Sequence, residues 1–448
     1  MSFVSQESPN PLSERPVLAT VLAALLAVPL LGVVMFSAAA SPTETFVALV
    51  ALAAVVVLLL RIEAALLVLV AAGALEEAFR ISSNPQLTMT KVAGAICFAS
   101  FAWYALTSRR PLLLDRSHAV VVGILLIALA STVQAFDAPI AVTTATRYAS
   151  FVALYLVVSQ FVGAHALQRR IAWVLTLASA AAAVIALHSY FAGDTVVATL
   201  PYANPSDFAF ILATTLPLSF WLLGASPRWR VPLLGVIGLI LAATVLSLSR
   251  GTIVGLAAGL AWMVFVDRRH VRLLVGGGLL ALLVAVLVIR SDPSRFETAL
   301  LYKEKVADYN VTTRYDAWSA AAELAVEKPL LGVGPGNFRF YYNELTDRPA
   351  GTHNLYVAHN AYLDVAAELG ILALVLFLLY LAMTMGRLTV AARRGYGPPG
   401  YARALRVSLV IAIVSAMFVS EQYYPPFWLL GGLATAVWAE GGRARRER

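Results

Sequence analysis

Long apolar runs separated by short polar connections follow one another along almost the whole chain. Most of them approach the ~20 residues that an α-helix needs to cross the hydrocarbon core of a bilayer. The pattern predicts spans at 17–40, 45–60, 64–75, 88–106, 119–136, 139–162, 171–190, 208–223, 231–248, 252–266, 273–288, 361–385, 407–419 and 427–439. Because 64–75 and 427–439 are short for a crossing, we expect an all-α polytopic membrane protein with about 12–14 transmembrane helices.

One stretch interrupts this pattern, because residues 291–360 are polar and rich in aromatic side chains. It ends in two His-Asn pairs, His353-Asn354 and His359-Asn360, directly before an apolar run. We expect three parts: 1–290 as an N-terminal transmembrane helix bundle, 291–360 as a large loop with short helices and catalytic residues, and 361–448 as C-terminal transmembrane helices with a basic tail. A polar loop that holds histidines at a membrane surface is where chemistry is expected first.

Charge orients the predicted helices. Basic residues cluster at Arg61, Arg109–Arg116, Arg169-Arg170, Arg228–Arg230, Arg268–Arg272, Arg387–Arg406 and Arg443–Arg448. With the spans above, all of these clusters fall on one side of the membrane. Because cytoplasmic loops are rich in Lys and Arg, this side is expected to be cytoplasmic. Both termini are therefore expected inside, and the loop 291–359 outside.

Composition agrees with a membrane protein and removes one class of partner. Hydrophobic residues make up 60% of the chain and charged residues 13%, with a mean hydropathy of +0.79. A soluble domain has about 25% charged and 45–50% apolar residues. The net charge of +8 follows from the cytoplasmic clusters. It therefore indicates contact with membrane lipids and does not argue for nucleic acid.

Common cofactor and metal motifs are missing from the sequence. Cys97 is the single cysteine and lies in a predicted span, so no intramolecular disulfide is possible. The chain has no C-x-x-C, H-E-x-x-H or P-loop pattern, and Gly334-Pro335-Gly336 is interpreted as a turn. The long loop also lacks an Asp-x-Asp pair. We therefore expect neither a metal ion nor a cofactor.

Two arginines lie in or beside predicted spans. Arg147 is eight residues after Pro139, which places it roughly 12 Å along a helix. An intramembrane arginine usually faces protein or a water-filled cavity and marks function. Arg250 lies at the outer end of the hairpin between 231–248 and 252–266, where Gly251 is expected to permit the turn. The alternatives are that Arg147 reaches the outer headgroups and that Arg250 anchors on lipid phosphate.

A third arginine, Arg314, lies in what is interpreted as the first turn of a helix. Thr313 is the expected N-cap, and Asp316 follows three residues later as in a capping box. Free backbone N–H groups at a helix start bind anions, so Arg314 beside them predicts a phosphate ligand. The alternative is a local ion pair between Arg314 and Asp316.

The same helix is expected to lie along the membrane surface or to pack on the spans. Its end is predicted at Lys328-Pro329, because proline stops a helix. One face is expected to carry Tyr315, Trp318, Ala322 and Ala325.

His359 is the candidate for proton transfer. Histidine is the side chain whose ordinary pKa of about 6.5 lets it accept a proton near neutral pH. The start of a predicted span fixes the position of His359, and Asn360 beside it could orient the imidazole or an acceptor. His353 has similar surroundings but is not held at the start of a helix, so it is the second candidate for proton transfer. The alternative is that His359 only caps the helix or anchors at the interface.

Together, the three arginines and the histidine are expected on one face of the membrane. Arginine binds phosphate oxygens with two parallel hydrogen bonds, so a cluster of arginines indicates a diphosphate or another polyanion. The expected reaction is a metal-independent transfer, in which arginines neutralise a leaving diphosphate and a histidine activates the nucleophile. We expect catalysis from His359, Arg250 and Arg314, and substrate contacts from Arg147, His353, Asn360, Tyr315 and Asn204.

Three segments carry a resemblance to a known family: SLSRGTIVGL, TTRYDAWSAAAELAVEKPLLGVGPGNF and HNAYLDVAAELGILAL. Over roughly 201–381 the chain resembles the O-antigen ligase/polymerase family of bacterial membrane glycosyltransferases. The polar turn at Asn204-Pro205 is part of this similarity. The resemblance implies essential roles for Arg250, Arg314 and His359, and a GT-C-type architecture. It also implies the bacterial inner membrane, with the active site in the periplasm.

By this resemblance, the enzyme takes a glycan from undecaprenyl diphosphate and transfers it, with inversion, to an acceptor hydroxyl. Within the family the acceptor varies. Lipid A-core oligosaccharide makes the enzyme a ligase, a second carrier-linked repeat makes it a polymerase, and a pilin hydroxyl makes it a protein glycosyltransferase. A transporter of an anionic lipid-linked glycan is the alternative from another class, although it would be expected to show internal repeats and interrupted helices.

Overall fold

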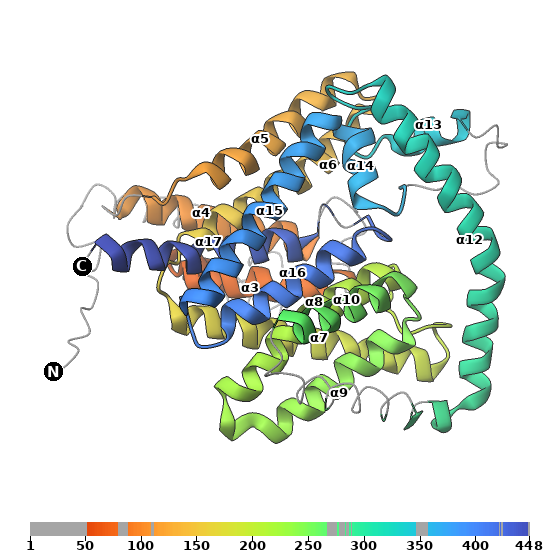
Figure 1. The fold of residues 1–448 in the computed structure, drawn as a ribbon, viewed down its shortest axis with the longest axis horizontal. Helices are drawn as coiled ribbons and strands as arrows, with labels where there is room; N and C mark the ends of the chain where they lie inside the picture. Colours follow the sequence, from red (N-terminus) through yellow and green to blue (C-terminus); the bar gives the residue numbers. More distant parts are fainter. Residues whose placement is uncertain are drawn as a thin grey trace, which may run out of the picture. The chain divides into compact units, whose positions relative to one another are not determined.

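A computed structural model describes residues 52–78, 88–108, 112–266, 276, 283, 286–287, 289–345, 357–420, 422 and 424–446 of the chain. Within these ranges the regular structure is entirely helical (Figure 1). The predicted all-α class is therefore confirmed. The numbering of the helices starts at α3 and follows the labels in Figure 1.

Seven described helices are long and apolar enough to cross a membrane. They are α4 (Met89–Thr107), α5 with its last turn (Arg116–Gln134), α6 (Ala138–Ser159), α7 (His165–Ala192), α8 (Pro205–Ala225), α9 with its first turn (Pro227–Leu246) and α15 (Ile371–Arg394). An eighth would be the pair Leu52–Leu60 and Ile62–Ala78, bent by 116°. The polytopic prediction is thus confirmed, while the predicted spans 17–40 and most of 273–288 lie outside the described residues.

The remaining predicted spans correspond to shorter or more polar helices. They are α10 (Arg250–Val266), α14 (Ala361–Leu369), α16 (Tyr401–Ser415) and α17 (Pro425–Arg446). The chain divides by its contacts into two compact units, Met1–Leu69 with Val92–Leu112, and Val70–Lys91 with Leu113–Arg448. All the candidate site residues belong to the second unit.

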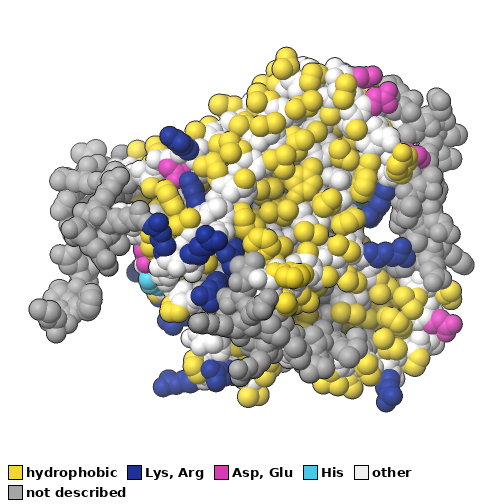
Figure 2. All heavy atoms as spheres, in the orientation of Figure 1, with side chains coloured by type: hydrophobic (Ala, Val, Ile, Leu, Met, Phe, Trp, Pro, Cys, Tyr) yellow, Lys and Arg dark blue, Asp and Glu magenta, His cyan; other side chains and the backbone are white. Residues whose placement is uncertain are grey.

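Within the second unit, two groups of helices share α16. One group packs α5, α6, α15 and α17 together, and the other packs α7, α8, α9 and α10. α16 contacts α8 and α10 on one side and α15 and α17 on the other. Hydrophobic side chains cover most of the face drawn in Figure 2, including the region of α5 and α15. Leu126 on α5 and Val375 on α15 are among the exposed residues, as expected of surfaces that face lipid.

The long helix α12 (Pro293–Glu327) runs along one edge of this unit (Figure 1). At its start, the guanidinium of Arg295 lies 5.1 Å from the ring centroid of Tyr190, near the end of α7. At its other end, Ala317, Ala321 and Leu324 are buried against α13 (Phe338–Leu345) and α14. α12 therefore connects the end of α7 to the segment around α14.

The expected start of this helix is wrong. α12 begins at Pro293, and Thr313 lies in its interior. Asp292 accepts a hydrogen bond from the Arg295 N–H, and a proline at the first position is already set for the helix. Arg314 is thus mid-helix, where the backbone N–H groups bond within the helix, so Arg314 does not lie beside the free N–H groups of a helix start. The predicted end is confirmed, since Lys328 is the C-cap.

Of the four residues expected on one face of this helix, Ala325 is buried and Trp318 is partly buried, and the other two are exposed. Tyr315 is 71% exposed and Ala322 is exposed, whereas Ala317, Ala320 and Ala321 are buried. A longer helix docked at both ends presents the small alanines to α14, because they allow close approach of the two backbones.

The predicted span 361–385 is interrupted at Gly370. This residue has φ of 89° and separates α14 from α15. An added Cβ there would lie 2.6 Å from the carbonyl oxygen of Pro329. The Ile371 N–H donates to the same oxygen at 2.8 Å. Glycine is required at position 370 because the backbone that follows α12, at Pro329, lies in direct contact with it.

The Gly332–Asn337 turn joins the segment after α12 to the α5–α6 connection. Asn337 accepts a hydrogen bond from the Asp137 N–H at 2.7 Å, and Gly334 N–H donates to the Glu368 carbonyl at 3.0 Å. Gly334 and Gly336 have φ of 97° and 72°, so the interpretation of Gly-Pro-Gly as a turn is confirmed. The turn brings α14 and the outer ends of α5 and α6 into one assembly.

Gly334→Ala is expected to lower the melting temperature of the detergent-solubilised protein by several degrees. A Cβ at this position would lie 2.6 Å from the Ala135 Cβ, on a backbone that side chains rarely adopt. Gly224→Ala is the matched control, because it meets no atom within 4 Å in α8. An unchanged melting temperature for Gly334→Ala would contradict the assigned turn.

Candidate functional site

Arg250 is the first residue of α10 and is exposed. The turn before it is made by Leu248, whose φ of 49° is left-handed. Gly251 was expected to permit this turn, and that expectation is wrong, because Gly251 already belongs to α10. An added Cβ there would collide with Phe418, and one at Gly259 would lie 2.6 Å from Ile411. Gly251 and Gly259 therefore allow α10, which begins at Arg250, to pack closely against Phe418 and Ile411.

Arg314 lies partly buried near the middle of α12. Burial, and after it the charge of Arg250, lowers the pKa of Arg314 below its ordinary value. The two guanidinium groups, which are far apart in the sequence, are therefore close enough to repel each other. Among the described residues, neither arginine has a recorded ion pair or hydrogen bond with a carboxylate.

His359 has an unusual backbone conformation, with φ of 53°. A left-handed conformation is uncommon for a residue with a side chain, and it persists only where the surroundings enforce it. Here the neighbours on both sides are held. The Ala358 N–H donates to the Asp364 carboxylate at 2.8 Å, and the Ala358 carbonyl accepts from the Trp318 indole at 3.0 Å. Asn360 is the N-cap of α14 and accepts from the N–H groups of Tyr362 and Leu363.

The Trp318 contact ties the histidine segment to α12. Trp318 follows Arg314 by one helical turn, so the hydrogen bond to Ala358 places Arg314 on the same side as His359. Burial, and after it the charge of Arg314, lowers the pKa of His359 from 6.5 to about 4. At neutral pH the imidazole is therefore uncharged and able to accept a proton.

Three predicted site residues thus come together: Arg250, Arg314 and His359. Two like charges beside a neutral imidazole form a local excess of positive charge, and an anion would relieve the repulsion between them. Within the described ranges, no group of three or more His, Cys, Asp or Glu is arranged to hold a metal ion. The positive groups that this arrangement presents to a ligand are the guanidinium groups of Arg250 and Arg314.

The other candidate residues have different positions. Arg147 is exposed on α6, and its positive charge repels that of Lys91. Tyr315 is 71% exposed on the outer side of α12. Asn204 caps α8 by accepting a hydrogen bond from the Ser206 N–H at 2.9 Å. His353 lies outside the described residues.

Two carboxyl groups below the site were missed in the sequence. Asp364 and Glu368 are fully buried on α14, which is not one of the seven spans. Burial raises the pKa of both side chains, and the proximity of Asp364 raises that of Glu368 further. Asp364 accepts hydrogen bonds from Ala358 and from the Ser420 hydroxyl. Acidic residues four positions apart in an apolar run were the available signal, because this spacing places them on one helix face.

Comparison with known proteins assigns the central part of the chain. Residues 235–378 match the protein family described as O-antigen ligase. This match confirms the family resemblance for a segment that contains Arg250, Arg314 and His359. No curated protein matches the chain.

Proposed function

We propose that this chain, whose residues 235–378 match the O-antigen ligase family, transfers a glycan from undecaprenyl diphosphate to a hydroxyl of lipid A-core oligosaccharide. The transfer takes place at the periplasmic face of the bacterial inner membrane, with inversion and without a metal ion. One observation carries the proposal: Arg250 and Arg314 lie close together beside an uncharged His359, with no recorded carboxylate partner among the described residues.

The proposed reaction divides the work between these residues. The acceptor oxygen forms a bond with the anomeric carbon of the donor sugar, while the bond from that carbon to the diphosphate oxygen breaks. The His359 imidazole takes the proton from the acceptor hydroxyl, and the diphosphate leaves with the electron pair. Arg250 and Arg314 neutralise the charge that develops on the leaving group, which is where fixed cations act most strongly.

The low pKa of His359 has a consequence for this mechanism. A base with a pKa of about 4 is weak at neutral pH, because the most effective bases have a pKa near the working pH. Bound diphosphate would place negative charge beside Arg314 and reduce its effect on the imidazole. We therefore infer that donor binding raises the pKa of His359 and strengthens the base only when substrate is present.

The pH dependence of transfer tests this coupling. The value of kcat/KM for the donor reports the free enzyme, and kcat reports the donor complex. We expect kcat/KM to stay flat from pH 8 down to about pH 5 and to fall as His359 is protonated near its pKa of about 4. The acid limb of kcat should lie at higher pH. If both limbs coincided at about 6.5, His359 would have an ordinary pKa in both states.

A transfer assay tests the proposed function directly. Purified protein should move a radiolabelled glycan from undecaprenyl diphosphate to lipid A-core, and EDTA should leave the rate unchanged. Dependence on added magnesium or manganese would overturn the metal-independent mechanism. Transfer only to a second carrier-linked repeat would identify a polymerase, and movement of the intact carrier-linked glycan without a new glycosidic bond would identify a transporter.

The orientation is tested by labelling cysteines from outside intact spheroplasts, in a Cys97→Ala background. A probe at Asn343 in α13 should react, and one at Gly397 between α15 and α16 should not, because the basic clusters are expected to face the cytoplasm. Reversed labelling would place Arg314 and His359 on the side where the donor glycan is not presented.

A further inference from the structure

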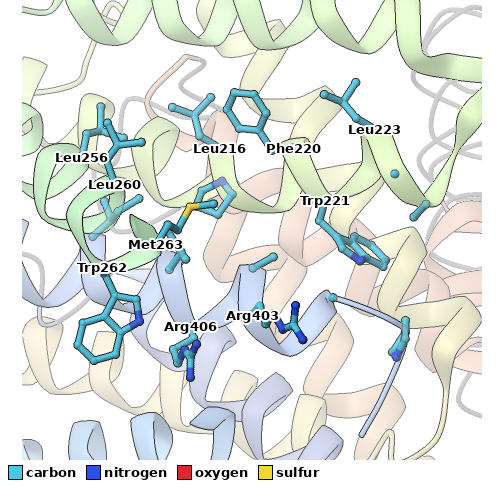
Figure 3. Close-up of a pocket in the computed structure, with 18 of the residues that line it drawn as sticks. Leu216, Phe220, Trp221, Leu223, Leu256, Leu260, Trp262, Met263, Arg403 and Arg406 are labelled. Carbon is cyan, nitrogen blue, oxygen red and sulfur yellow. The ribbon is translucent and has the colours of Figure 1, made fainter. Parts of the chain in front are cut away.

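A large apolar cavity lies between helices α8, α9, α10 and α16 of the second unit. Its volume is about 1060 Å³. Leu216 and Phe220 of α8 face Leu256 and Met263 of α10 across it (Figure 3). Leu260, also on α10, lines the cavity while 45% of it remains exposed. The cavity is thus an apolar space that reaches the outer surface of the helix bundle.

One end of the cavity is basic. Four arginines line it, Arg169, Arg230, Arg403 and Arg406, and its described lining includes no Asp or Glu. Figure 3 shows Arg403 and Arg406 entering from α16, below the apolar side chains. The Arg406 guanidinium lies 5.8 Å from the ring centroid of Trp262. Arg169 lies near the start of α7, Arg230 begins α9, and Arg403 and Arg406 lie near the start of α16. This is the side expected to be cytoplasmic.

The cavity is long enough for the hydrocarbon chains of a lipid. Along α9 its lining runs from Arg230 to Val245, which corresponds to about 22 Å at 1.5 Å per residue. One leaflet contributes about 15 Å of hydrocarbon to a bilayer. The Trp221 indole donates to the Pro399 carbonyl at 2.9 Å beside the basic end. Tryptophan is typical of the level of the headgroups.

We propose that this cavity binds an anionic phospholipid of the cytoplasmic leaflet. Its acyl chains would lie between α8, α9 and α10, and its phosphate would contact Arg169 and Arg403. Basic pockets between transmembrane helices on the cytoplasmic side suit acidic headgroups. The basic end, where the phosphate would lie, is separate from the proposed active site, because Met263 lies about 20 Å along α10 from Arg250. Only the apolar lining continues along α10 to Ile253, one turn from Arg250. The lipid site therefore does not depend on the proposed function.

Native mass spectrometry with delipidated, full-length protein tests the preference for an anionic headgroup. We expect phosphatidylglycerol to bind at least tenfold more tightly than phosphatidylethanolamine. The exposed pair Arg169→Gln/Arg403→Gln should remove this preference, and Arg393→Gln should keep it, since Arg393 is an exposed arginine of α15 outside the cavity. Equal affinity for the two lipids, or an unchanged preference in the double variant, would overturn the proposal.

A photocrosslinking residue in place of Leu260 tests whether the acyl chains of the lipid occupy the cavity. In vesicles of phosphatidylglycerol and phosphatidylethanolamine with added undecaprenyl phosphate, the adduct should carry phosphatidylglycerol in excess of its share of the vesicle. The same probe in place of Leu378, an exposed residue of α15, should label lipids in proportion to the vesicle composition. An adduct with undecaprenyl phosphate, or with the protein chain itself, at position 260 would overturn the proposal.

Discussion

Replacing Arg314 with alanine is expected to lower kcat/KM for glycan transfer by about 10²–10³-fold, the usual loss when one fixed donor to a developing negative charge is removed. Arg250→Ala should have an effect of the same order. The reason is the pair itself: the two arginines repel each other in the free protein, and each becomes favourable when a diphosphate lies between them. Transfer of a radiolabelled glycan to lipid A-core, measured with purified protein, provides the rates.

Lysine at either position should restore only part of the loss, because a single ammonium cannot make the two parallel hydrogen bonds of a guanidinium. Arg228→Ala is the control, since Arg228 is exposed at the other end of the α8–α9 hairpin. Melting temperatures should be similar for all variants. Near-normal transfer by Arg314→Ala would remove this residue from the reaction.

His359→Ala is expected to lower kcat by about 10²–10⁴-fold, which is the usual contribution of a general base. Donor binding should persist, because donor affinity depends on the arginines and the imidazole is uncharged near neutral pH. A filter assay with the carrier-linked donor measures binding, and transfer is measured in the same preparation. His359→Ala should therefore lose transfer and keep donor binding, whereas Arg314→Ala should weaken both.

His353→Ala is the matched control for this prediction. It should retain clearly measurable transfer, because the residues that hold His359 in place are Ala358, Trp318 and Asp364. An inactive His353 variant with an active His359 variant would mean that the other His-Asn pair supplies the base. If both variants transferred normally, base catalysis by histidine would be excluded.

The sequence predicted the helical class, and seven of the described helices are long and apolar enough to cross a membrane as predicted, because apolar length is a strong signal in a bilayer. It did not predict where helices continue or break. The polar stretch before Thr313 was interpreted as a helix start, although α12 continues through it from Pro293 and is held at both ends by tertiary contacts. The break at Gly370 arises from close contact with Pro329, which is about 40 residues earlier in the chain. Such distant contacts leave no local pattern.

The candidate site was predicted in part. Arg250 and His359 were singled out from their positions beside apolar runs, Arg314 from an expected helix start, and all three from the family resemblance. In the structure, the charge of Arg250 acts on Arg314 and the charge of Arg314 acts on His359. The reason first given for Arg314, a helix N-terminus, was wrong, and its position instead follows from the Trp318–Ala358 hydrogen bond. The buried Asp364 was missed because its role is visible only once Ala358 is seen to donate to it.

Arg250, Arg314 and His359 are proposed to surround one diphosphate site. The most direct measurement is a cryo-electron microscopy structure of the protein with undecaprenyl diphosphate bound. We expect phosphate oxygens within hydrogen-bonding distance of both guanidinium groups, with the His359 imidazole facing the space left for an acceptor hydroxyl. A diphosphate bound elsewhere, with Arg250 and Arg314 unliganded, would contradict it.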